Sequence, residues 1–163
     1  MKKWYKKLIA VALSIAFIVV ITLLFWPKPP IPQKITRQLT SPLLLPQASQ
    51  FKVKPGSAKF DTSLSLLSFA VMVAGDQIAV SEQPTPESFT DVPAVYQKVL
   101  GSMNNYYDFD TPVGTVYLTL PHQLNGLQTA VLNADGTLLF AKPHSNLSEA
   151  KWRQFFDTVN VDR

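Results

Sequence analysis

A 19-residue run without charge near the start of the chain constrains its fold and location more than any other feature. Between Leu8 and Trp26 only Ser14 and Thr22 are polar. As a helix this run would be about 28 Å long, close to the roughly 30 Å hydrocarbon core of a bilayer. Residues 8–26 are therefore predicted to be a transmembrane signal-anchor helix, with Leu8 and Trp26 at its ends and the lipid bilayer as its partner.

The orientation of this helix follows from the residues that flank it. Four lysines lie within residues 1–7, and the positive-inside rule keeps such an end in the cytoplasm. The alternative is a cleaved leader, whose apolar stretch is about 7–15 residues long and ends in small residues. Here the run is longer and ends in "LLFWP". We therefore expect a single-pass protein of the cell membrane with its C-terminal domain outside.

The net charge of +4 gives no indication of a nucleic-acid partner. The chain has 15 lysines and arginines and 11 aspartates and glutamates, and four of the lysines precede the apolar run. The remaining 11 cations equal the 11 acids, so the exported part is neutral, and it has no P-loop or zinc-finger motif. The absence of cysteine excludes disulfides, thiolate metal sites and a cysteine nucleophile.

Composition divides the chain into four segments. Residues 1–7 form a basic cytoplasmic N-terminus, residues 8–26 the anchor, residues 27–46 a linker and residues 47–163 an extracytoplasmic domain. The linker holds six of the 13 prolines, which favour an extended polyproline II conformation. Its "LLL" at residues 43–45 is too apolar for a pure spacer, so we expect part of the linker to pack on the domain.

The exported domain alternates strand patterns with two helical patterns. Residues 66–73 and 77–82 predict a hairpin, and further strands are expected at residues 106–109, 113–120, 127–133 and 137–142. Asp135-Gly136 is a strong hairpin turn signal between the last two. Apolar periodicity predicts helices near residues 92–100 and 148–159, the second with Ser148 as N-cap. The fold class is therefore α+β, an antiparallel sheet of five to seven strands with two helices on one face.

Several segments carry a resemblance to known domains, namely "IAVSEQPTP", "TPVGTVYL", "TAVLNADGTLLFA" and "LSEAKWRQFF". In this arrangement the chain resembles small membrane-anchored extracytoplasmic domains of unknown function in bacteria. It is more loosely similar to the half-barrel domains of lipoprotein-sorting and envelope-stress regulator proteins. The second resemblance implies a curved sheet whose concave side, covered by helices, can receive acyl chains. Neither resemblance supplies catalytic residues.

Two histidines are the candidates for metal or acid–base chemistry. If residues 113–120, 127–133 and 137–142 form an up-down-up meander, His122 and His144 emerge at the same end of the sheet, with Glu149 near them. Imidazole and carboxylate groups are suitable metal ligands, but the chain has no HExxH motif or other short-range ligand pair. Two exposed loop histidines are the favoured interpretation, and no metal, cofactor or catalytic residue is predicted.

Paired carboxylates in "YYDFD" offer a second acid–base candidate. Asp108 and Asp110 lie two residues apart and would share one face of a strand. The following Thr-Pro indicates an ordinary turn, so solvated carboxylates at the end of a strand are the favoured interpretation.

Four aromatic residues form a candidate recognition surface on the sheet: Tyr106, Tyr107, Phe109 and Tyr117. Exposed aromatics can bind a peptide, a glycan or a partner domain. The competing interpretation is that they are cross-strand pairs which stabilise the sheet.

These features favour a non-enzymatic module that binds an envelope component, lipid, glycan or partner protein. One alternative is an envelope-acting hydrolase or metal-binding enzyme that uses His122, His144 or the Asp108/Asp110 pair. A second is a structural subunit of a membrane assembly.

Overall fold

The computed structural model describes residues 29–47, 49–73, 75–91, 98, 101, 106–119 and 126–162. The predicted anchor at residues 8–26, with Leu8 and Trp26, lies outside them, as does nearly all of the helix predicted at residues 92–100. Within the described part no helix is long and apolar enough to cross a bilayer.

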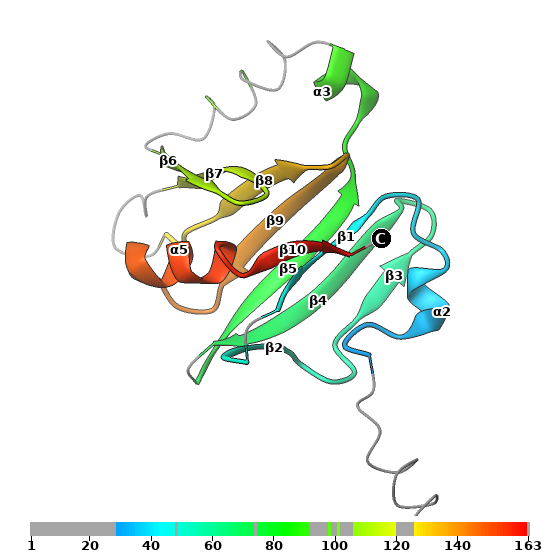
Figure 1. Ribbon diagram of the computed structural model, residues 1–163, viewed down its shortest axis with the longest axis horizontal. Helices are drawn as coiled ribbons and strands as arrows, with labels where there is room; N and C mark the ends of the chain where they lie inside the picture. The colour runs from blue at the N-terminus through cyan, green and yellow to red at the C-terminus, as the bar shows by residue number, and fades with distance from the viewer. Residues whose placement is uncertain are drawn as a thin grey trace, which may run out of the picture.

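The described chain is mostly antiparallel β-sheet with few helices, as predicted for the exported domain (Figure 1). One sheet has eight strands rather than the five to seven expected. Its strands are β2 (Phe51–Val53), β3 (Lys59–Asp61), β4 (Leu66–Val73), β5 (Asp76–Pro84), β6 (Tyr106–Thr111), β7 (Gly114–Thr119), β8 (Ala130–Ala134) and β9 (Thr137–Pro143).

The order of strands along this sheet is β2, β4, β5, β9, β8, β7 and β6, and β3 also pairs with β4. The predicted hairpins β4–β5 and β8–β9 are confirmed, and so is the up-down-up meander of β7, β8 and β9. Asp135 and Gly136 have φ of 53° and 80°, the left-handed conformation that a two-residue hairpin turn requires.

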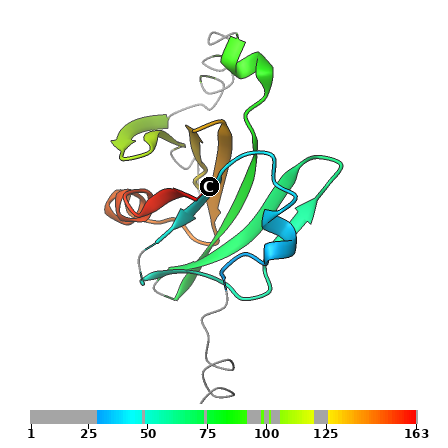
Figure 2. The ribbon, with the colours of Figure 1, turned by 45° about the vertical axis from the view of Figure 1, so that its right-hand side comes forward.

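A second layer covers one face of the curved sheet (Figures 1 and 2). It contains helix α5 (Glu149–Phe156) and a two-stranded antiparallel ribbon of β1 (Leu43–Pro46) and β10 (Val159–Asp162). The predicted helix at residues 148–159 is therefore too long at its C-terminal end, because Val159–Asp162 pair with β1 instead. Ser148 is the N-cap as predicted, and its hydroxyl accepts a hydrogen bond from the Lys151 N–H.

The core lies between the eight-stranded sheet and this second layer. Trp152, Phe155 and Phe156 of α5 are at most 1% exposed. The ring of Phe155 packs on Phe51 of the sheet and that of Phe156 on Phe109. Burial of such side chains is the main stabilising contribution to a domain without disulfides. The outer face of the sheet carries a smaller apolar cluster below α3 (Glu87–Asp91).

The described part of the segment predicted as a linker belongs to the folded domain. Ile31 is 1% exposed, residues 43–45 are buried in β1, and between them lies the short helix α2 (Gln33–Thr36). The expectation that part of this segment packs on the domain is confirmed for residues 43–45. The folded domain reaches back at least to Ile31, because the apolar side chains of this stretch enter the core despite the prolines around them.

Candidate functional site

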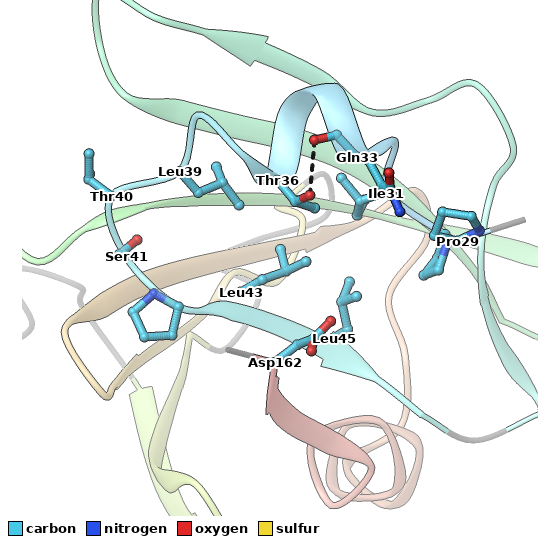
Figure 3. Close-up of a pocket in the computed structure, with 12 residues that line it drawn as sticks. Pro29, Ile31, Gln33, Thr36, Leu39, Thr40, Ser41, Leu43, Leu45 and Asp162 are labelled. Carbon is cyan, nitrogen blue, oxygen red and sulfur yellow. Dashed lines mark hydrogen bonds between the residues drawn. The ribbon is translucent and has the colours of Figure 1, made fainter.

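A cavity in the described part of the chain lies between α2, the loop after it and the β1–β10 ribbon (Figure 3). Its volume is about 440 Å³. Leu43 and Leu45 of β1 point toward Ile31 and α2 across the cavity. The residues that line it are Pro29, Pro30, Ile31, Gln33, Thr36, Leu39, Thr40, Ser41, Pro42, Leu43, Leu45 and Asp162.

One wall of this pocket is the short helix α2, which begins directly after a proline. Pro32 precedes α2, and its carbonyl accepts the N–H groups of Ile35 and Thr36. The helix ends after one turn at Arg37, where the chain bends back toward β1. A helix this short has little stability of its own, so the burial of Ile31 beside it must hold it in place.

The floor of the pocket is fixed by pairing between distant parts of the chain. β1 pairs with β10 in a register that places Leu43 opposite Asp162. On its other edge, β1 meets two polar side chains from the inner face of the main sheet. The Leu44 N–H donates to Glu82 Oε2 at 3.2 Å, and Thr137 Oγ1 donates to the Pro42 carbonyl at 2.6 Å. Polar side chains thus replace the strand that would otherwise pair with this edge.

Glu82 is unusual among these contacts because it is a carboxyl group only 3% exposed. Its Oε1 has no hydrogen-bond partner among the described residues. Burial raises the pKa of Glu82 from its ordinary value of 4.5 to about 8, although the Leu44 N–H opposes the shift. At neutral pH the group is therefore mostly protonated, and β1 packs on a neutral acid.

The side chains that line the pocket are of the kinds found in ligand-binding sites. Its floor is aliphatic, and its rim carries the hydroxyl groups of Thr36, Thr40 and Ser41 and the amide of Gln33. Asp162 is the one ionisable side chain among the twelve lining residues. Ligand sites typically combine an apolar lining with a few polar groups and have volumes of about 300–1,000 Å³.

The histidine candidates are only partly placed by the structure. His144 is exposed just after β9, and its backbone N–H donates to the Gln77 carbonyl at 2.8 Å. Glu149 is exposed and forms a salt bridge of 2.8 Å with Arg153. His122 lies outside the described residues, within which no group of three potential metal ligands is found. The predicted set of His122, His144 and Glu149 therefore stays untested.

The four aromatic candidates divide between the two faces of the sheet. Tyr106 and Tyr117 lie on the outer face, with ring centroids 5.8 Å apart, and Tyr106 is 39% exposed. Phe109 is only 4% exposed and packs on Phe156, while Tyr107 is half-buried beside it. Alternation along β6 explains the division, and it leaves Tyr106 and Tyr117 as the surface-facing pair.

The two carboxylates of β6 share the outer face with Tyr106. Asp108 and Asp110 are both exposed, and Asp110 Oδ1 accepts a hydrogen bond of 2.8 Å from Thr115 Oγ1. This contact joins β6 to its neighbour β7 at the edge of the sheet.

The pocket residues were missed because they fall in the stretch taken for a linker. The available signal was the apolar content of that stretch, with Ile31, Leu39 and the three leucines of β1. Glu82 also gave a signal, since it follows Ile78 and Val80 at every second position, on the face that alternation assigns to the core.

Comparisons with known proteins found no matching family model, no matching curated protein and no matching solved structure.

Proposed function

We propose that the protein is a single-pass, membrane-anchored extracytoplasmic module that binds an apolar part of an envelope component, a lipid or a partner protein. The observation that carries the proposal is the open cavity of about 440 Å³ between α2, β1 and β10. The anchor is the apolar run at residues 8–26, and the cell membrane is the proposed location.

The position of the pocket supports this role. Pro29 and Pro30 line it, and they follow Trp26 by only three and four residues. An extended chain covers at most about 3.6 Å per residue, so Pro29 would lie within about 11 Å of the end of the anchor. The pocket would then face the surface of the membrane that holds the protein, where apolar ligands are concentrated.

Binding is favoured over catalysis by the side chains that line the pocket. General acid–base or nucleophilic chemistry needs at least two polar groups within hydrogen-bond reach of each other, one of them activated. Asp162 is the single ionisable group among the described residues of the lining, and the pairing of β1 with β10 places it opposite Leu43. An aliphatic floor with a hydroxyl-bearing rim instead suits an aliphatic ligand with a small polar end.

The proposal is tested with the full-length protein isolated from its own membranes. Lipids and proteins that co-purify are identified by mass spectrometry. Thr40 is exposed and lines the pocket, so Thr40→Trp places an indole ring in the cavity without disturbing the core. Thr62 is exposed in the turn between β3 and β4, and Thr62→Trp is the matched control.

The proposal predicts at least one lipid or protein that co-purifies with the wild type and with Thr62→Trp and is lost with Thr40→Trp. If every co-purifying species is recovered equally from both variants, the pocket is not the binding site.

A further inference from the structure

The exported part has a net charge of zero, but its positive and negative residues are distributed unevenly along the chain. Residues 27–60 contain six lysines and arginines and no acid. Residues 61–163 contain all 11 acids and only five lysines and arginines. The first quarter of the exported chain therefore carries +6 and the remainder −6.

Four of these cations form what we call the basic end: Lys34 and Arg37 at α2, and Lys52 and Lys54 at β2. All four side chains are exposed. Within the described residues the one salt bridge is between Arg153 and Glu149, so the basic end has no paired carboxylate there. Lys54 donates a hydrogen bond of 3.4 Å to the neutral side chain of Gln77.

The fold gathers the basic end beside the entry of the chain into the domain. Pro29 and Pro30 line the pocket below α2, and they also line a second cavity of about 470 Å³ with Lys52 and Phe51 of β2. Figures 1 and 2 show α2 and β2 in the lower half of the molecule, next to the start of the described chain. The elements α3 and β6, which carry Glu87, Asp108 and Asp110, lie in the upper half.

Asp162 is the one acid among the described residues that line these two cavities. Asp76 lies in the turn before β5, where its carboxylate accepts hydrogen bonds from the Gln77 N–H and the Ser145 hydroxyl. These bonds hold the pKa of Asp76 below its usual range, so it stays charged.

We propose that the basic end docks on the anionic headgroups of the membrane in which the chain is anchored, and so holds the two proline-lined cavities against the lipid surface. This inference rests on the anchor of the proposed function. The tether makes docking intramolecular, which raises the effective concentration of the membrane at this end.

An anionic lipid surface fits these observations better than an acidic protein. The cations are spread over α2 and β2 around apolar cavities, and a membrane offers both negative charge and apolar chains over such an area. Juxtamembrane basic residues are attracted to such surfaces within about one Debye length, roughly 10 Å at 0.1 M salt. The short connection from Trp26 to Pro29 would place the start of the described domain near that surface.

The chain contains no cysteine, so a single one can be introduced for labelling. Gln38→Cys places a fluorophore just after α2, and Ser88→Cys places one in α3 as the distant control; both positions are exposed. The full chain is reconstituted into vesicles of phosphatidylcholine alone or mixed with phosphatidylglycerol, each containing a lipid with a headgroup quencher. Quenching of each label measures the fraction of docked domain.

The label at position 38 should be quenched strongly in the anionic vesicles and weakly in the neutral ones, and the label at position 88 weakly in both. Removing one juxtamembrane lysine should lower the ratio of docked to undocked domain about fivefold. Lys52→Gln should do so, whereas Lys151→Gln on the exposed side of α5 should not. Salt at about 1 M should abolish the difference between the lipids.

Equal quenching in the two lipid mixtures, or a Lys52→Gln variant that docks like the wild type, would overturn the proposal. A basic end that instead binds an acidic protein would give this lipid-independent result. The anchor is scored separately by flotation of the vesicles after an alkaline wash. If the alkaline wash removes the chain from the vesicles, the anchor of the proposed function is refuted. Docking is then tested separately, by comparing how much protein floats with anionic and with neutral vesicles at low salt.

Discussion

The buried acid below β1 makes the stability of the domain depend on pH in an unusual direction. In the folded protein the pKa of Glu82 is about 8, and in the unfolded chain it returns to about 4.5. Between these values the folded state binds a proton that the unfolded state has released. The free energy of unfolding therefore falls as the pH rises through this window.

The size of the effect follows from the two pKa values. With the linkage relation, the contribution of Glu82 to the free energy of unfolding becomes less favourable by about 2.5 kcal/mol between pH 5 and pH 7. Its full span up to pH 9 is about 4 kcal/mol, an upper value because water can relax around the ionised group. A change of this size is a large fraction of the stability of a small domain.

Glu82→Gln is the perturbation that isolates this group. The amide keeps the shape of the carboxyl group and an oxygen that can accept the Leu44 N–H, but it does not titrate. Urea unfolding of the full chain in nonionic detergent, followed by fluorescence and repeated from pH 5 to pH 8, gives the free energy of unfolding for each variant. Asp108→Asn, which removes an exposed carboxylate, is the control.

From pH 5 to pH 7 the free energy of unfolding of the wild type should fall by about 2.5 kcal/mol relative to that of Glu82→Gln. The free energy of unfolding of Asp108→Asn should follow that of the wild type. Parallel curves for wild type and Glu82→Gln would show that Glu82 does not titrate in this window. The account of a neutral acid below β1 would then be refuted.

Three further substitutions, each measured by urea unfolding at pH 6, test two contacts of the second layer and the turn between β8 and β9. Thr137→Val should cost about 1–3 kcal/mol because the Pro42 carbonyl loses its donor, and an unchanged midpoint would show that this contact contributes nothing. Trp152→Phe should cost about 1–3 kcal/mol because the indole N–H no longer donates to Gln128 Oε1, at 2.8 Å, and a cost below experimental error would contradict this reading. Gly136→Ala should cost about 1–2 kcal/mol at a φ of +80°, and a stabilised variant would contradict the turn geometry.

The long strands and α5 could be predicted because their signals are local. β4 is rich in strand-forming residues, β5 and β7 alternate at every second position, Asp135-Gly136 marks the β8–β9 turn, and Ser148 caps α5. Each of these depends on residues that are neighbours in the sequence. For this reason the hairpins and the meander were predicted correctly.

The β1–β10 ribbon of the second layer could not be predicted, because its pairing joins the two ends of the domain. Leu43 lies opposite Asp162, and four residues of β10 alone cannot be distinguished from the end of a helix. β2 and β3 have only three residues each, too few for a periodic pattern. The pocket depends on this long-range pairing, and its residues were therefore assigned to a linker.

The central claim, that the pocket below α2 is a binding site, can be tested by photocrosslinking in native membranes. A diazirine-bearing aliphatic amino acid is placed at Leu39, which lines the pocket, or at Leu64, which is 64% exposed outside it. The account predicts one lipid or protein adduct at position 39 that is absent at position 64 and lost in the Thr40→Trp variant. Adducts of the same kind and yield at both positions would contradict it.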